Sequence, residues 1–291
     1  MYIELHARSA FSFLQGAVLP DALAYGCVQL DLPGMALVDR NGVSGAPFFH
    51  QSMTNNKLKA HVGAEIGLAE SGSWLPLLPA TQAGYKNLCR LITTIKLRTS
   101  KNIPATATFS ELEQFAGGCI CLTGDENGPL AHALRRGGKE EGRHLLERLK
   151  FIFGAENIYV ELQRHFRPEQ EQGNQIAVEL GSELKLPLLA TNGVLYATPE
   201  DREVLDVFTA LHHKCNLDTA GRLLSVNAER HIRTAAQMAK GNKPIAALLI
   251  ESAKTKKTQT KIEPQPEGDA AMNEVDHPFV PASLEPISRV V

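Results

Sequence analysis

Gly34-Met-Ala-Leu-Val-Asp39-Arg40 is a short apolar run that ends in two charged residues, and the same pattern recurs along the chain. The first run, Tyr2 to Leu5, leads into His6, and a third, His61 to Ile66, carries Glu65 near its end. In a parallel barrel the carboxyl ends of the strands gather on one face, where catalytic side chains collect. The pattern therefore predicts a site at one end of a barrel.

Strand-like runs alternate with helix-like segments over most of the chain. The expected strands are residues 2–5, 34–38, 61–66, 74–78, 119–122, 158–162 and 187–190. This alternation favours a parallel sheet, and seven units favour a closed or nearly closed barrel. An open doubly wound sheet is the less favoured alternative, because no Gly-x-Gly-x-x-Gly turn follows the first strand. Two helix starts are predicted, at the capping box Ser110-Glu-Leu-Glu113 and at Thr198-Pro-Glu-Asp201.

Composition indicates an ordinary soluble chain without a general attraction to nucleic acid. The 291 residues carry a net charge of −2, so any basic surface must be local. The five cysteines lack metal-ligand spacing, which fits a reduced, cytoplasmic chain, and no apolar stretch is long enough for a membrane span. Residues 1–240 are expected to form the barrel domain. Residues 241–291, rich in Pro, Glu and Lys, are expected to form a flexible, disordered tail.

Several motifs, in order along the chain, resemble the polymerase and histidinol phosphatase (PHP) domain of bacterial DNA polymerase III alpha subunits. The likeness is greatest to the error-prone, translesion form of that subunit. The motifs are Tyr2-Ile-Glu-Leu-His-Ala-Arg-Ser-Ala-Phe-Ser-Phe-Leu-Gln-Gly-Ala17, Met35-Ala-Leu-Val-Asp-Arg-Asn-Gly-Val-Ser-Gly45, Gly63-Ala-Glu65, Gly84-Tyr-Lys-Asn-Leu-Cys-Arg-Leu-Ile92, Val160-Glu-Leu-Gln-Arg-His165 and Leu189-Ala-Thr-Asn-Gly-Val-Leu-Tyr-Ala-Thr-Pro-Glu-Asp201.

The resemblance implies a distorted (β/α)7 barrel that, in active relatives, holds up to three divalent ions for phosphoester hydrolysis. Three residues of the family's ligand types remain here, namely His6, Asp39 and Glu65. Asp125 lies near another ligand position, and His165 is a further candidate, with a structural histidine as its alternative reading. Nothing in the chain corresponds to the family's polymerase modules, so we expect no primer extension.

The chain departs from the family pattern at the other ligand positions. Where active relatives carry His-x-His, Asp-His and Asp-x-His, this sequence has Arg8, Arg40, and the pair Gly193 and Leu195. A guanidinium stays protonated and has no lone pair for a metal. We therefore expect at least one of the two arginines to pair with Asp39 or Glu65, which would otherwise be buried without a partner.

Three functions follow as hypotheses. The favoured one is a non-catalytic structural or interaction module linked to DNA replication and repair, with replication or translesion-repair proteins as partners and no cofactor. The second is a metal-dependent phosphoesterase or 3′–5′ exonuclease with a reduced site, which would need Mn, Zn or Mg. The third is a module that binds the phosphate backbone of DNA without cleaving it. Two basic stretches, Arg135-Arg136 with Lys139 and Lys254 to Lys261, could contact phosphates, although a solvated surface is the simpler reading.

Overall fold

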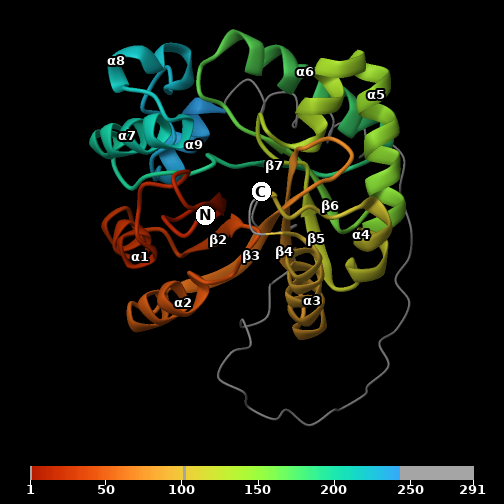
Figure 1. The fold of residues 1–291 in the computed structure, drawn as a ribbon, viewed down its shortest axis with the longest axis horizontal. Coiled ribbons are helices and arrows are strands. Elements are labelled where there is room, and N and C mark those ends of the chain that lie inside the picture. The colour runs from red at the N-terminus through yellow and green to blue at the C-terminus, as the bar shows by residue number, and fades with distance from the viewer. Residues whose placement is uncertain (1, 101–102, 243–291) are drawn as a thin grey trace, which may run out of the picture.

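The computed structural model describes residues 2–100 and 103–242 as a curled sheet surrounded by helices (Figure 1). The strands in that part of the chain are β1 (Glu4–Ala7), β2 (Gly34–Arg40), β3 (Lys59–Gly67), β4 (Trp74–Pro79), β5 (Cys119–Leu122), β6 (Ile158–Leu162) and β7 (Leu188–Ala190). They follow one another in the sheet in the order of the sequence. The predicted α/β barrel fold is confirmed, with strand ends that shift by up to two residues.

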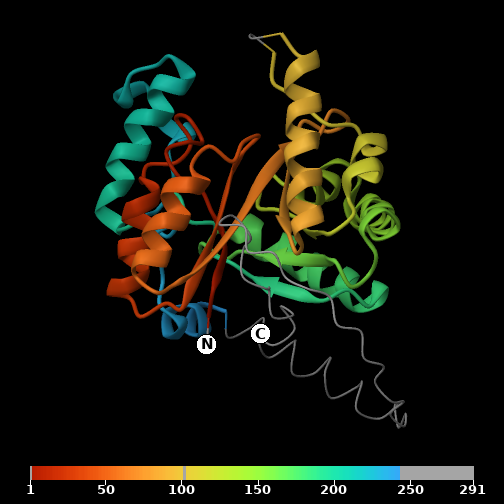
Figure 2. The same cartoon turned by 90° about the horizontal axis from the view of Figure 1, so that it is seen from below.

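The helices lie on the outside of this sheet, on both flanks (Figure 2). They are α1 (Pro20–Gln29), α2 (Ala46–Asn55), α3 (Gln82–Arg98), α4 (Phe109–Phe115), α5 (Pro129–Phe153), α6 (Pro168–Leu184), α7 (Arg202–His213), α8 (Leu217–Ala220) and α9 (Ala235–Gly241), with short 3-10 helices at Pro199–Asp201 and Gly221–Leu223. Within the described residues, none of these helices is both long and apolar enough to cross a bilayer.

The sheet is not entirely parallel, contrary to the sequence-based expectation. β4 runs antiparallel to both β3 and β5, whereas the other neighbouring pairs are parallel. The reason is the connection: β3 and β4 are joined by a short turn around Gly72 rather than by a helix, and a short turn reverses the chain direction.

The two edges of the sheet meet just after β7. The Arg8 amide donates to the Val194 carbonyl over 2.9 Å, and the Val194 amide donates to the His6 carbonyl over 3.0 Å. The buried Glu4 carboxylate also accepts the Asn192 amide at 2.8 Å. These bonds draw the segment that follows β7 against β1, so the C-terminal ends of both edge strands face the same space.

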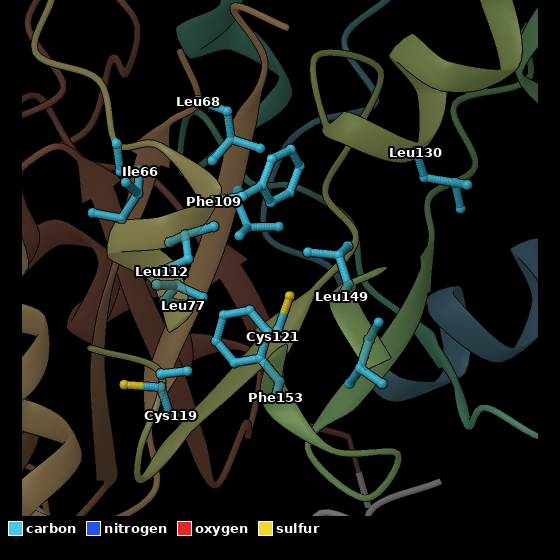
Figure 3. Close-up of a cluster of buried hydrophobic side chains, with 14 of the residues drawn as sticks. Ile66, Leu68, Leu77, Phe109, Leu112, Cys119, Cys121, Leu130, Leu149 and Phe153 are labelled. Atoms are coloured by element: carbon cyan, nitrogen blue, oxygen red, sulfur yellow. The ribbon is translucent and has the colours of Figure 1, made fainter. Parts of the chain in front are cut away.

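An apolar cluster fills the interior of the curl. It contains Ile3, Leu5, Ala36, Val38, Leu78, Ile120, Leu122, Tyr159 and Leu189, which come from both edges and the middle of the sheet. A larger cluster packs β3 to β6 against the outer helices, and it includes Cys119 and Cys121 (Figure 3). Both thiols are free and buried, so these two cysteines are core residues.

One helix start differs from the expectation. The capping box of α4 is formed by Thr108 and Glu111, not by Ser110 and Glu113, because Thr108 is the residue with extended backbone and Phe109 already opens the helix. At the second predicted start, the Asp201 side chain accepts the Thr198 amide at 2.9 Å, as expected. The predicted tail and Lys254 to Lys261 lie outside the described residues, except for residues 241 and 242, which form the end and the C-cap of α9.

Candidate functional site: a buried charge network

Charged side chains lie where the barrel interior reaches the C-terminal ends of the strands. Val38 and Tyr159 belong to the apolar cluster inside the barrel. Successive side chains of a strand point to opposite faces, so Arg40 and Glu161, each two residues farther along the same strand, point to the barrel interior as well. We use the name buried charge network for His6, Arg8, Arg40, Glu65, Asp125, Glu161 and Arg230.

His6 lies at the centre of this network and is fully buried. Its Nδ1 is 2.7 Å from Glu161 Oε1, and its Nε2 is 2.7 Å from Glu65 Oε1. Burial alone would lower the pKa of His6, but the two carboxylates outweigh it and raise the pKa to about 10. At neutral pH the ring is therefore an imidazolium whose two N–H groups each donate to a carboxylate.

Glu65 receives positive charge from three sides. Besides His6, its Oε2 accepts Arg40 Nε at 2.8 Å, and Arg8 Nε lies 3.7 Å away. Burial would raise the pKa of Glu65, but Arg8, Arg40 and His6 lower it to about 2. The prediction that an arginine pairs with Asp39 or Glu65 is confirmed by Arg40 and Glu65. The Arg40 guanidinium also stacks on Trp74, 4.4 Å from the ring centroid.

Asp125 is held by two guanidiniums on one oxygen. Arg8 Nη2 and Arg230 Nη2 each donate to Asp125 Oδ2 at 2.7 Å. Burial would raise the pKa of Asp125, but the two arginines hold it well below its usual range. The shortest ion pair of Arg8 is thus with Asp125, while Glu65 Oε2 lies farther away at 3.7 Å. The loop after β5 brings Asp125 to Arg8, and Asp39 is already engaged elsewhere.

Asp39 fastens the loop that follows β1. Its carboxylate accepts the Ser9 amide at 2.8 Å, the Ser9 hydroxyl at 2.8 Å and the Ser12 hydroxyl at 2.7 Å. Burial raises the pKa of Asp39, and these three hydrogen bonds oppose the rise. The same loop exposes Phe11 and Phe13, which are 43% and 78% accessible.

His165 stands apart from the network. Its Nε2 is 2.8 Å from the Asn192 carbonyl oxygen, and its Nδ1 is 3.1 Å from Gln170 Nε2. Burial and the nearby Arg230 lower the pKa of His165 to about 3, so the ring is neutral at pH 7. In this state Nε2–H donates to Asn192 and Nδ1 accepts from Gln170. The contacts of His165 therefore hold the segment after β7 in place.

Glu161 and Arg230 were missed by the sequence-based reasoning. Glu161 leaves a signal, because it is a single carboxylate within an otherwise apolar strand. Arg230 leaves none, because it lies in an irregular segment between α8 and α9. The Arg230 side chain passes beside Gly193, whose φ is +58°, to reach the network. A Cβ on Gly193 would stand 2.7 Å from Arg230 Nη2 and 2.4 Å from Gln163 Oε1, so Arg230 takes the room of a side chain there.

The candidate ligand residues do not form a metal-binding group within the described residues. Over residues 2–100 and 103–242, no group of three or more His, Cys, Asp or Glu side chains is arranged to hold a metal ion. The carboxylates of the network instead meet the side chains of His6, Arg8, Arg40 and Arg230.

Comparison with known proteins places these observations in a family context. The sequence profile of the PHP domain matches residues 4–165. Over 249 residues, the chain is 31% identical to an error-prone DNA polymerase of Mycolicibacterium paratuberculosis, covering 82% of this chain and 23% of that protein. It is 28% identical over 242 residues to a DNA polymerase III subunit alpha of Vibrio cholerae, covering 81% of this chain and 21% of the other. The chain thus spans less than a quarter of the length of these relatives.

Solved structures give a more distant likeness. A candidate metal-dependent phosphoesterase from Bifidobacterium adolescentis superposes with a TM-score of 0.49 at 12% identity, over 66% of this chain and 87% of that one.

Proposed function

Because the chain belongs to the PHP domain family, we propose that it is a PHP module linked to DNA replication and repair, in which arginines and a protonated histidine stand in for metal ions. In this proposal the module is a structural or interaction unit and does not hydrolyse phosphoesters. Its partners are replication or translesion-repair proteins, in keeping with its similarity to DNA polymerase III alpha and error-prone polymerase chains.

The contact of both His6 ring nitrogens with carboxylates is the observation that carries the proposal. An imidazole ligates a metal through a lone pair on a ring nitrogen, and an imidazolium has no such pair. Both ring nitrogens of His6 lie 2.7 Å from a carboxylate oxygen, and the carboxylates raise the pKa of His6 to about 10. The candidate ligand most central to the site is thus committed to internal ion pairs.

The arginines support the same reading. Arg8 is 3% exposed and Arg230 is 8% exposed, and both bind Asp125. Each guanidinium supplies the positive charge that a buried carboxylate needs, and neither can ligate a metal. Since Arg230 occupies the room above Gly193, a carboxylate at position 193 would have to displace it. The donor set therefore does not fit a metal cluster, and we derive no catalytic step through one.

The two alternative functions gain less support. A phosphoesterase or exonuclease needs His6, Asp39, Glu65 and Asp125 free to ligate, whereas each accepts or donates within the protein. Phosphate-backbone binding needs accessible cations at the barrel mouth, and Arg8 is buried against a carboxylate. Neither alternative has an observation in its favour beyond the family itself.

An exposed aromatic patch supports the interaction role. Phe11 stacks on Phe48 with ring centroids 5.9 Å apart, and Phe13 on the same loop is 78% exposed. The loop is anchored by Ser9 and Ser12 on Asp39, so one of the family's ligand-type residues now fixes the shape of a surface. The occupant that we propose for this patch is a DNA polymerase segment outside the part of the longer relatives that this chain matches.

The test of the proposal is metal content together with hydrolysis. Protein purified from cells supplemented with Mn, Zn and Mg should contain no stoichiometric metal and should not degrade single-stranded DNA ends or p-nitrophenyl phosphate. The contrary result is one or more tightly bound ions per chain, with activity lost in His6→Ala but kept in a control variant of the exposed His144, His144→Ala.

A further inference from the structure

A cavity of about 540 Å³ lies between α5 and α6, beside the C-terminal ends of β5 and β6. Small-molecule sites in proteins typically measure roughly 300–1,000 Å³, whereas packed interiors rarely leave voids larger than one water. The cavity is therefore of the size of a ligand site. It shares Asp125 and Glu161 with the buried charge network, but most of its lining residues belong to the two helices.

Apolar side chains of both helices line this cavity, and two glycines add no side chain that would fill it. Leu130 and Leu134 of α5 face Ile176 of α6. Gly138 on α5 and Gly173 on α6 also line the cavity, and among the described residues nothing beyond their own helix stands within 4 Å of where a Cβ would be. Glycine is a poor helix former, and Gly173 has neither a close contact nor a positive φ to require it. Its effect is to keep the cavity open.

At the rim of the cavity, one cationic side chain has no carboxylate partner within the described residues. In the basic stretch noted in the sequence, Arg136 pairs with Glu141, and Lys139 pairs with Glu179 at 2.7 Å. Arg135 lines the cavity and, within the described part of the chain, has no carboxylate at ion-pair distance.

Of the four acidic residues that line the cavity, Asp125, Glu126 and Glu161 pair with cations of the protein, whereas Glu169 has no cation at ion-pair distance within the described part of the chain. Asp125 is bound by Arg8 and Arg230, and Glu126 lies 3.2 Å from Arg230 Nη1 and 3.4 Å from Arg167 Nη1. Glu161 is bound by His6 and by the Gly124 amide. The floor thus offers no strong attraction for a cation, and its carboxylates would repel a ligand with several negative charges.

We propose that this cavity binds a small amphipathic anion, with an apolar body between α5 and α6 and a single carboxylate, sulfonate or phosphate group on Arg135. This inference does not rest on the proposed function, because it requires neither a particular state of the charge network nor a polymerase partner. The apolar helix walls supply affinity, and the unpaired guanidinium fixes the orientation.

The experiment uses 1-anilinonaphthalene-8-sulfonate, an aromatic monoanion, as a fluorescent probe on the full chain, with octanoate as competitor. One probe molecule should bind per chain and be displaced by octanoate. Gly173→Phe, which fills the cavity, should abolish this binding, and Arg135→Ala should weaken it by about three- to tenfold. Gly173→Ala adds one methyl group in open space, so it should bind the probe and unfold at the same or a higher temperature.

The matched control is Phe13→Ser, which alters the exposed aromatic patch and leaves the cavity intact. The proposal is overturned if Gly173→Phe, shown to be folded by circular dichroism, binds the probe as the parent does, or if Phe13→Ser abolishes the binding. It is also overturned if octanoate does not compete. Should Gly173→Phe fail to fold, Ala131→Phe, on the α5 wall of the same cavity, provides the same test.

Discussion

Replacing Arg230 by methionine should destabilise the protein, because it removes a buried cation that has several polar partners. Arg230 donates to Asp125 Oδ2 at 2.7 Å, to the Gly193 carbonyl oxygen at 2.9 Å and to Glu126 Oε1 at 3.2 Å. Methionine keeps much of the side-chain volume, so the effect reports the loss of these polar contacts rather than a cavity.

The size of the effect follows from burial. Arg230 and Asp125 are 8% and 5% exposed, and removing one partner of a buried ion pair leaves an uncompensated charge that costs about 3 to 5 kcal/mol. Asp125 keeps Arg8 as a partner, which places the expected loss near the lower limit, about 3 kcal/mol. The matched control is Arg167→Met: Arg167 touches Glu126 at 3.4 Å with 39% of its side chain exposed, and such pairs contribute about 0 to 1 kcal/mol.

Urea unfolding followed by circular dichroism measures both variants, and Asp125→Asn combined with Arg230→Met completes a double-mutant cycle. Because Asp125→Asn removes the charge that Arg230→Met exposes, the double variant should lose less than the sum of the two single changes. The reasoning is refuted if Arg230→Met costs no more than Arg167→Met, or if the two losses are additive.

Three further predictions concern the surroundings of the network. The pKa of His6 is raised to about 10, against 6.5 for a free imidazole. The contribution of His6 to the free energy of unfolding is therefore complete below pH 6.5 and is lost as the pH rises towards 10. Urea unfolding across this pH range should show the loss, and the His6→Gln variant should not show it. Ser12→Ala removes a 2.7 Å hydrogen bond to the buried carboxylate of Asp39 and should lower the free energy of unfolding by about 1 to 3 kcal/mol, and a change below the error of the urea titration would contradict this account of the loop. Gly193→Ala should lower the thermal unfolding midpoint more than Gly72→Ala. Both glycines have a positive φ, but only a Cβ at position 193 would contact other atoms. Equal shifts would mean that Arg230 does not need the space that the missing Cβ of Gly193 leaves.

The sequence was sufficient to predict the strands and the end of the barrel at which the site lies. Apolar runs such as Gly34 to Val38 are short and are followed by charged residues, and this pattern survives in the structure as β2 with Arg40 at its end. The direction of β4 could not be predicted with the same rule, because the rule assumes a helix between successive strands. The segment from Leu68 to Ser73 is too short for one, and its Gly72 adopts a positive φ, which signals a turn.

The site was only partly predictable, for a physical reason. Residues that lie next to strand ends, such as His6, Arg40 and Glu65, could be placed from local pattern. Pairing depends instead on which loops fold over the barrel mouth. Arg230 comes from a segment with no strand or helix of its own, and Asp125 from the loop after β5, so neither contact is encoded by spacing. The partners of Asp39 could not be predicted either, because Ser9 and Ser12 bind it through hydroxyl groups that leave no signal in a hydrophobic pattern.

The protonation state of His6 tests the central claim most directly, and nitrogen NMR of the imidazole side chain measures it. Protein labelled with ¹⁵N at its histidine rings, with His6→Gln for assignment, is examined between pH 6 and 9. The account predicts that both ring nitrogens of His6 remain protonated over this whole range, because Glu65 and Glu161 raise its pKa to about 10. A neutral ring at pH 7, with one nitrogen bare and its signal shifted by added Zn²⁺, would contradict the replacement of metal ions by the chain's own cations.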